Sequence, residues 1–185
     1  WASHGALPPI YAHSPWPWRK PPGVPPATFT GRRQGLLMRS SYLAYPKSRA
    51  NLVQRGVRVR RQVLCENLPD PTPDSITQRQ TLEPTTDQLA LMSTRTYIAN
   101  ITNNSTCLVC HNRINPTGFA FNNFDSFGRF RSNEKIYDSS GNFLRELPSD
   151  SASTVPLPGG DNVEIADAYD LVSAIANSTE GPGCF

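Results

Sequence analysis

The sequence predicts a mainly α-helical domain with extensive irregular chain and one small β-hairpin. Several segments repeat apolar residues at the three-to-four spacing of an amphipathic helix. The 185-residue chain contains 18 prolines and 12 glycines, and its hydrophobic content of 37% is low for a compact domain. The length fits one domain, so we expect a modest core wrapped by irregular chain.

The first 30 residues differ in composition from the rest of the chain. They carry all three tryptophans, Trp1, Trp16 and Trp18, among closely spaced prolines. Proline cannot continue a helix or a central strand, so we expect segment 1–30 to lie extended. Its tryptophans would dock it on the rest of the domain or on another chain, and residues 31–185 would form the folded domain.

Apolar spacing and capping residues predict the helices. Thr86 is a suitable N-cap for one of them, and Asp167 is a suitable N-cap for the last. The expected helices span 48–64, 86–103, 106–112 and 167–178, and residues 34–45 form a further short buried segment.

Turn-forming residues separate these helices. The prolines of 68–76 predict an extended linker. Asn115–Gly118 predicts a turn, because proline presets φ and glycine accepts positive φ. Residues 135–147 have the pattern of a β-hairpin around a turn at Ser139–Asn142, and we expect a loop over 148–161.

Charge and hydropathy exclude some classes of partner. The net charge of +3 is mild, and the arginine-rich segment 55–61 lacks the interleaved aromatic residues typical of nucleic-acid binding. No apolar run approaches the ~20 residues that span a bilayer, so we expect no transmembrane segment in this chain. No signal peptide is visible and Trp1 is not an initiator residue, which predicts a mature chain or a processed piece of a longer protein.

The segment Cys107-Leu108-Val109-Cys110-His111 carries the most specific chemical signal. It matches the pattern by which a c-type haem is attached covalently to protein. Two thiols about one helical turn apart can add to the two haem vinyl groups, and the histidine that follows can bind the iron. We therefore predict one covalently attached haem c, with thioethers at Cys107 and Cys110 and His111 as the proximal ligand.

Two other chemistries use a similar pair of cysteines. A structural zinc site needs four ligands, and the only other histidines, His4 and His13, lie in the proline-rich segment. Cys65 and Cys184 could complete such a site, but no spacing supports it. A redox-active dithiol of the thioredoxin type needs a βαβ context, which the sequence does not show. Both alternatives rank far below haem.

The ligand on the far side of the iron is open. Met38, in an apolar segment, ranks first among the candidates, and Met92 ranks next. His13, His4 and an unliganded site follow. A six-coordinate haem mostly transfers electrons, whereas an open site can bind peroxide or a small gas.

The two cysteines outside the motif, Cys65 and Cys184, have no local partner. Leftover cysteines in an exported protein tend to pair, so we predict a Cys65–Cys184 disulfide, with two buried free thiols as the alternative.

The surroundings of a haem can be predicted from chemistry alone. The Nδ1–H of His111 needs an acceptor, and a backbone carbonyl in Ile114–Thr117 is the nearest supplier. Arginines near the motif can bind the propionates, and phenylalanines can wall the macrocycle, although surface solvation and an ordinary core explain them as well. These candidate residues are Arg113, Arg129, Arg131, Phe119 and Phe124, with Phe121 and Phe127 as further wall residues. We expect Asp125 to be a turn acceptor rather than a catalytic base.

Several stretches together resemble one protein family. They are RRQGLLMRSSYLA (32–44), QRGVRVRRQVLCENLPDPTPD (54–74) and CLVCHNRINPTGFAFNNFDSFGRFR (107–131), followed by the hairpin and the last helix. Residues 20–185 are similar to the C-terminal, cytochrome-like region of large exported proteins of planctomycetes and related bacteria, most of them functionally uncharacterised. The resemblance is most specific over 107–131, where every fixed position of the family's C-x-x-C-H-x-x-I-[DN]-P-x-G-F-x-x-x-x-F-D-x-x-G-x-[WFY]-R signature is met.

The resemblance implies haem c in an exported, periplasmic or extracellular protein, and it supports pairing of Cys65 with Cys184. It implies no established substrate. The sequence thus predicts a c-type cytochrome-like, monohaem domain that transfers electrons as a piece or subunit of a larger assembly, with a redox protein as partner. The alternatives are a peroxidase-like haem enzyme with an open distal site and a structural subunit of an electron-transfer complex.

Overall fold

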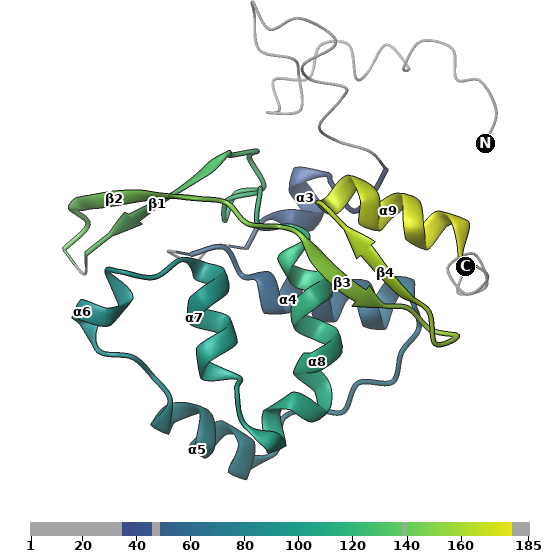
Figure 1. Cartoon of the computed structure of the whole chain (residues 1–185), viewed down its shortest axis with the longest axis horizontal. Coiled ribbons are helices and arrows are strands. Elements are labelled where there is room, and N and C mark those ends of the chain that lie inside the picture. The colour runs from purple at the N-terminus through teal and green to yellow at the C-terminus, as the bar shows by residue number, and fades with distance from the viewer. Residues whose placement is uncertain (1–34, 46–48, 139, 179–185) are drawn as a thin grey trace, which may run out of the picture. The chain divides into compact units, whose positions relative to one another are not determined.

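The computed structural model describes residues 35–45, 49–138 and 140–178. The docking segment expected at 1–30 lies outside the described residues, as do Cys184, His4 and His13. The described chain forms seven α-helices, one π-helical segment and two separate two-stranded antiparallel sheets (Figure 1). It is therefore a mixed α and β domain, so the expected fold is confirmed in part: the helices and one hairpin are present, and a second hairpin was not expected. The cytochrome-like part of that expectation stays a prediction.

The short helix α3 (Ser40–Leu43) lies within the predicted buried segment 34–45. The next predicted helix, 48–64, is confirmed as α4 (Leu52–Arg58), which continues into the π-helical segment Val59–Val63. The side chain of Asn51 caps α4 by accepting a hydrogen bond from the backbone N–H of Gln54 at 3.2 Å.

Two boundaries between residues 68 and 103 differ from the expected ones. The linker ends at Thr72, which caps α5 (Pro73–Thr81), because proline fits the first turn of a helix. The helix expected over 86–103 is two helices, α6 (Thr86–Leu89) and α7 (Thr94–Ile101). Thr85 rather than Thr86 caps α6 through a capping box, and Ser93 starts the second helix by accepting from the Thr96 N–H at 3.1 Å.

Helix α8 (Ser105–Phe119) is 15 residues long, so the turn expected at Asn115–Gly118 was wrong. Pro116 lies inside the helix, where it removes one backbone hydrogen bond. Packing against α4 holds the helix together: a Cβ placed on Gly118 would lie 2.2 Å from the carbonyl oxygen of Leu52. A Cβ on Gly56 would lie 2.3 Å from the carbonyl oxygen of Ile114, so the two backbones touch at this crossing.

The predicted hairpin is confirmed as β1 (Asn133–Tyr137) paired with β2 (Phe143–Pro148). A second hairpin, β3 (Ser153–Pro156) paired with β4 (Asn162–Ile165), stands where a loop over 148–161 was expected. The last helix is confirmed as α9 (Ala168–Asn177), with Asp167 as its N-cap.

The main core joins α3, the π-helical segment, the chain that directly follows α8, the second hairpin and α9. Arg55 lies buried beside it and donates hydrogen bonds to the carbonyl oxygens of Leu43, Phe121, Phe124 and Asp125. Burial lowers the pKa of Arg55 to about 10, so the guanidinium stays charged at neutral pH. These hydrogen bonds anchor the chain that follows α8. No described helix is long and apolar enough to cross a membrane.

Candidate functional site

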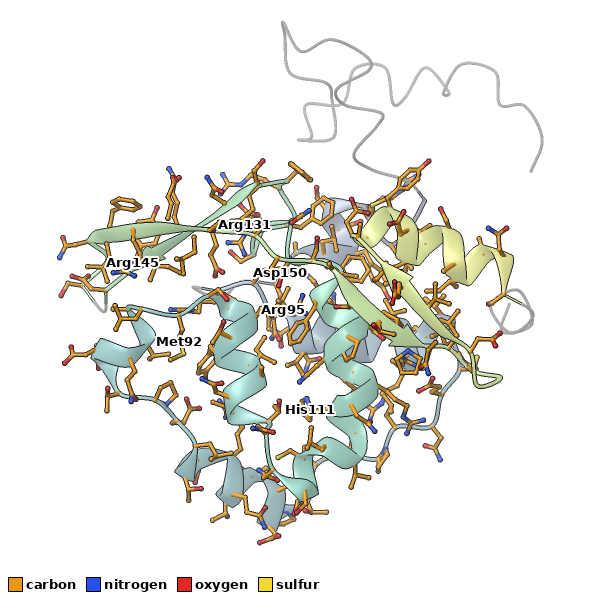
Figure 2. The ribbon with its side chains drawn as sticks, in the orientation of Figure 1. Met92, Arg95, His111, Arg131, Arg145 and Asp150 are labelled. Atoms are coloured by element: carbon orange, nitrogen blue, oxygen red, sulfur yellow. The ribbon has the colours of Figure 1, made fainter. Side chains whose placement is uncertain are left out.

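The Cys107–His111 motif occupies the first half of α8, as the sequence predicts. Asn104 caps this helix, and its side-chain oxygen accepts a hydrogen bond from the Cys107 N–H at 2.8 Å. Cys107, Cys110 and His111 stand at positions i, i+3 and i+4, which lie on one face of a helix. Figure 2 shows His111 on the side of α8 that is turned toward α7.

This face of α8 is only partly covered. Cys107 is 8% exposed, whereas Cys110 and His111 are half-buried. Leu108 and Val109, between the two thiols, are exposed, Val109 to 67%. One motif thiol is therefore buried, whereas the other thiol and the imidazole keep part of their surface exposed.

A chain of hydrogen bonds starts at the imidazole ring of His111. Its Nδ1 lies 2.8 Å from Oδ1 of Asn115, and Nδ2 of Asn115 donates to Oγ1 of Thr102 at 2.9 Å. The Thr102 hydroxyl donates in turn to the backbone carbonyl of Ile98 at 2.7 Å. The acceptor thus comes from the expected segment Ile114–Thr117, but it is a side-chain amide rather than a backbone carbonyl.

Cys107 has a polar neighbour of its own. The amide Nδ2 of Asn104 lies 3.2 Å from the Cys107 sulfur. Asn104 therefore both caps α8 and orients the first thiol, and it holds that sulfur on the face shared with His111.

Helices α5 and α6 are thinly covered by the rest of the domain. Among the described residues, neither α5 nor α6 contains a buried side chain. Ile76 on α5 is 45% exposed, and Leu91, in the connection between α6 and α7, is 61% exposed. Figure 1 shows α5 beneath the lower ends of α7 and α8, so the exposed apolar surface of α5 lies close to the first turns of α8, whereas α6 lies on the far side of α7.

The methionines proposed as iron ligands lie in different environments. Met38 is 1% exposed in the main core, whose members include Phe121 and Phe124 but neither Cys107 nor His111. Met92 is half-buried in the connection between α6 and α7. Figure 2 shows Met92 near α6, on the same side of α8 as α7.

The arginines proposed for the propionates have protein partners. Arg113 lies 3.6 Å from a carboxylate oxygen of Glu66. Arg129 pairs with Asp125 at 2.7 Å and is largely exposed. Arg131 donates to the backbone oxygen of Asn122 at 3.3 Å, near the base of the first hairpin (Figure 2). The structure thus places Arg129 and Arg131 away from the motif, and Arg113 two residues beyond it.

The phenylalanines proposed as walls divide between two clusters. Phe124 packs in the main core and meets Phe130 edge-on at 5.8 Å. Phe119 packs against Leu52 and Ile98 in a smaller cluster, with the Arg95 guanidinium 4.7 Å from its ring centre. Since Phe119 follows Asn115 by one turn, it is the phenylalanine nearer to the His111 hydrogen-bond chain.

Asp125 is a turn acceptor, as expected. Its Oδ1 accepts the backbone N–H groups of Phe127 at 2.9 Å and Arg129 at 2.8 Å. The carboxylate therefore closes the turn that leads from α8 to the first hairpin.

Among the described residues, the free thiols are those of Cys107 and Cys110, and Cys65 is not one of them. Because Cys184 lies outside the described residues, its pairing with Cys65 stays a prediction. The described residues contain no group of three or more His, Cys, Asp or Glu side chains that could hold a metal ion. The zinc alternative therefore gains no support from this part of the chain.

Sequence reasoning missed the polar residues around the motif. Asn104 could have been found, because Asn three residues before Cys107 fits an N-cap. Asn115 stands four residues after His111, a helical spacing that was overlooked because a turn was expected there. Thr102 is a tertiary contact from α7, and no local pattern indicates it.

Fold and motif together define a class: a small mixed α and β domain whose longest described helix opens with a C-x-x-C-H sequence. The chain belongs to the PSCyt3 family, described as a protein family of unknown function (DUF1588), whose model matches residues 33–134. The match extends from just before α3 into β1 and includes all of α8. The family's name associates it with cytochromes, and its description assigns no activity. Neither the curated proteins nor the solved structures contain a match to this chain.

Proposed function

We propose that this domain binds one haem c covalently through α8 and transfers electrons as an exported piece or subunit of a larger assembly. The observation that carries the proposal is the hydrogen bond between His111 Nδ1 and Asn115. It leaves the lone pair of Nε2 for a metal on the helix face that also holds two free thiols.

The residues of this face fit the chemistry of attachment. Each thiol would add across one vinyl group, with the sulfur bonding to one vinyl carbon and the hydrogen going to the other. Cys107 and Cys110 lie about one turn apart on one helix face, as two neighbouring vinyl groups require. His111 follows at once and can bind the iron from the same face. When bound, the haem would supply a one-electron couple at its iron.

The surface beside the motif also fits a haem. Helix α5, which lies close to the first turns of α8, contains no buried side chain among the described residues, and its Ile76 is exposed. An apolar, flat group held by α8 would cover such surface and remove it from water. Helix α5 would then form part of the haem's enclosure.

For the far side of the iron we favour Met92 over Met38. Met38 is buried in the main core, in a cluster that contains no residue of the motif. Met92 lies half-buried in the connection before α7, on the same side of α8 as α7. Arg113, two residues after His111 and half-exposed, is the arginine best placed to meet a propionate.

Attachment is tested by expressing the full chain together with a cytochrome c maturation system and weighing the purified protein. We expect the mass of one added haem, retained in denaturant, and the absorption bands of haem c. Cys107→Ala with Cys110→Ala should abolish the addition. Val109→Ala is the matched control, because this exposed residue lies inside the motif without belonging to it. A wild-type chain that carries no haem under these conditions would refute the proposal.

The burial of Met38 favours a second candidate function, a haem enzyme with an open distal side. Binding of carbon monoxide to the reduced protein separates the two. A methionine-type charge-transfer band in the oxidised protein, lost in Met92→Ala but kept in Met38→Ala, supports the electron carrier. Rapid carbon monoxide binding by the wild type supports the enzyme.

A further inference from the structure

We propose that Asn115 is the positioning residue of His111, and that Thr102 and the carbonyl of Ile98 fix its direction. Together they hold the imidazole in its Nδ1–H tautomer and present the bare Nε2 to the ligand. The purpose of this arrangement rests on the proposed function, but the arrangement itself exists in the chain without a haem.

The direction of the chain follows from its last member. A backbone carbonyl can only accept, so the Thr102 hydroxyl must donate to it. The other oxygen near that hydroxyl, the carbonyl of Ala99 at 3.5 Å, can also only accept. The Thr102 oxygen is therefore left as an acceptor for the hydrogen bond that it shares with Asn115.

The orientation of the Asn115 amide in turn decides which imidazole nitrogen carries the proton. Its NH₂ group must face Thr102, so its Oδ1 faces the imidazole at 2.8 Å. An amide oxygen cannot donate, so the proton of a neutral imidazole must be on Nδ1. The donor and acceptor roles of Asn115 and His111 therefore all follow from the carbonyl of Ile98, which can only accept.

Burial makes it costly to reverse the donors and acceptors in this chain of hydrogen bonds. Asn115 and Thr102 are both buried, so water cannot easily replace a lost partner. If the Asn115 amide were flipped, its oxygen would need the Thr102 hydroxyl, and the carbonyl of Ile98 would lose its donor. An imidazole free in water favours the opposite tautomer, Nε2–H. The proposal therefore predicts that His111 in the folded chain has the Nδ1–H tautomer, and that loss of its partners returns it toward Nε2–H.

The kind of acceptor also matters for a bound iron. A neutral amide accepts a weaker hydrogen bond than a carboxylate does, so it leaves His111 less electron-rich. We therefore expect Asn115 to hold the reduction potential higher than an aspartate at the same position would.

The first experiment uses the full chain without haem, labelled with ¹⁵N. At about pH 8, above the ordinary histidine pKa of about 6.5, two-bond ¹H–¹⁵N spectra distinguish the tautomers. His111→Gln assigns the His111 signals against those of His4 and His13. We expect Nδ1–H for His111 in the wild type, and a shift toward Nε2–H in Asn115→Leu and in Thr102→Val.

Asn112→Leu is the matched control, because Asn112 is an exposed asparagine on the same helix. It should leave the His111 tautomer unchanged. Thr102→Val tests the same chain from α7 and serves where Asn115→Leu does not fold. An Nε2–H tautomer in the wild type, or an equal change in Asn112→Leu, overturns the proposal.

The second experiment uses the haem-loaded chain. Asn115→Asp should shift the oxidised-to-reduced ratio at fixed potential about tenfold toward oxidised, about 59 mV for one electron. Asn112→Asp adds the same charge at an exposed position and should shift the ratio less. Equal shifts would mean that charge alone acts and would refute the role in tuning. A chain that binds no haem contradicts the proposed function, whereas the tautomer experiment still decides this inference.

Discussion

Replacing Gly56 with alanine should force α4 and α8 apart at their crossing. The added Cβ would lie 2.3 Å from the carbonyl oxygen of Ile114 and 3.1 Å from the backbone nitrogen of Gly118. Ordinary contacts begin at 3.4 Å, so the new carbon is more than 1 Å too close to a backbone atom. A backbone cannot rotate out of the way as a flexible side chain can, so the whole helix must move.

Whether Gly56→Ala raises or lowers the free energy of unfolding tests this geometry. In an uncrowded helix, alanine in place of glycine stabilises by roughly 0.5–1 kcal/mol. Overpacking costs about 1–3 kcal/mol, and a backbone obstacle places Gly56 at the upper end of that range. We therefore expect a net loss of about 2 kcal/mol in the free energy of unfolding.

Urea unfolding of Gly56→Ala and of the wild type measures this loss in the free energy of unfolding. Gly118→Ala obstructs the same crossing from the other helix and should cost a similar amount. The double variant should lose less than the sum, because the first substitution already separates the helices. Gly141→Ala is the control, since its Cβ would meet nothing within 4 Å and only its φ of +84° opposes the change. A Gly56→Ala protein more stable than the wild type would refute the reasoning.

Two further predictions concern pH and thiols. Burial raises the pKa of Tyr42 to about 12, while a phenol in the unfolded chain ionises near 10. Stability should therefore fall between pH 10 and 12, by roughly 1 kcal/mol once the partial exposure of Tyr42 is allowed for, and the fall should be smaller in Tyr42→Phe. Urea midpoints of both proteins at the two pH values measure the fall, and an equal fall in the two proteins would refute the prediction. In denaturant without reductant, alkylation of the haem-free chain should label the two motif cysteines, whereas Cys65 and Cys184 should react only after reduction. Labelling of all four before reduction would exclude the Cys65–Cys184 disulfide.

Helices and strands that are determined by contacts between near neighbours in the chain could be predicted from the sequence. Asp167 caps α9 by accepting from the backbone N–H groups of Tyr169 and Asp170, and both partners follow it directly. The first hairpin forms around a turn sequence that lies between its two strands. In each case the residues that decide the structure are close neighbours in the chain, so one segment suffices to infer it.

Elements decided by distant contacts were not predicted. Pro116 argues locally for a turn, and the crossing of Gly118 with α4 maintains a helix there instead. The second hairpin has strands of four residues, which are too short for a clear alternation. It is recognisable only once Val155 and Ile165 are seen buried in the main core.

The same distinction applies to the candidate site. Cys107, Cys110 and His111 were found because their spacing is itself the chemical signal. Arg129, proposed as a propionate ligand, pairs with Asp125 four residues earlier in the turn after α8, and its role at a haem stays a prediction.

The two halves of α8 differ in a way that suits a haem helix. The second half, from Ile114 onward, is buried and crosses α4 backbone to backbone. The first half carries the motif, and its neighbour α5 contains no buried side chain among the described residues. Asn115 stands at the boundary between the halves and connects His111 to α7. His111 keeps its position because its hydrogen-bond partner, Asn115, is buried in the second half of α8. The surface beside His111 stays open to a large apolar ligand. The crossing at Gly56 would then serve the site from a distance, since separating α4 from α8 would also displace Asn115.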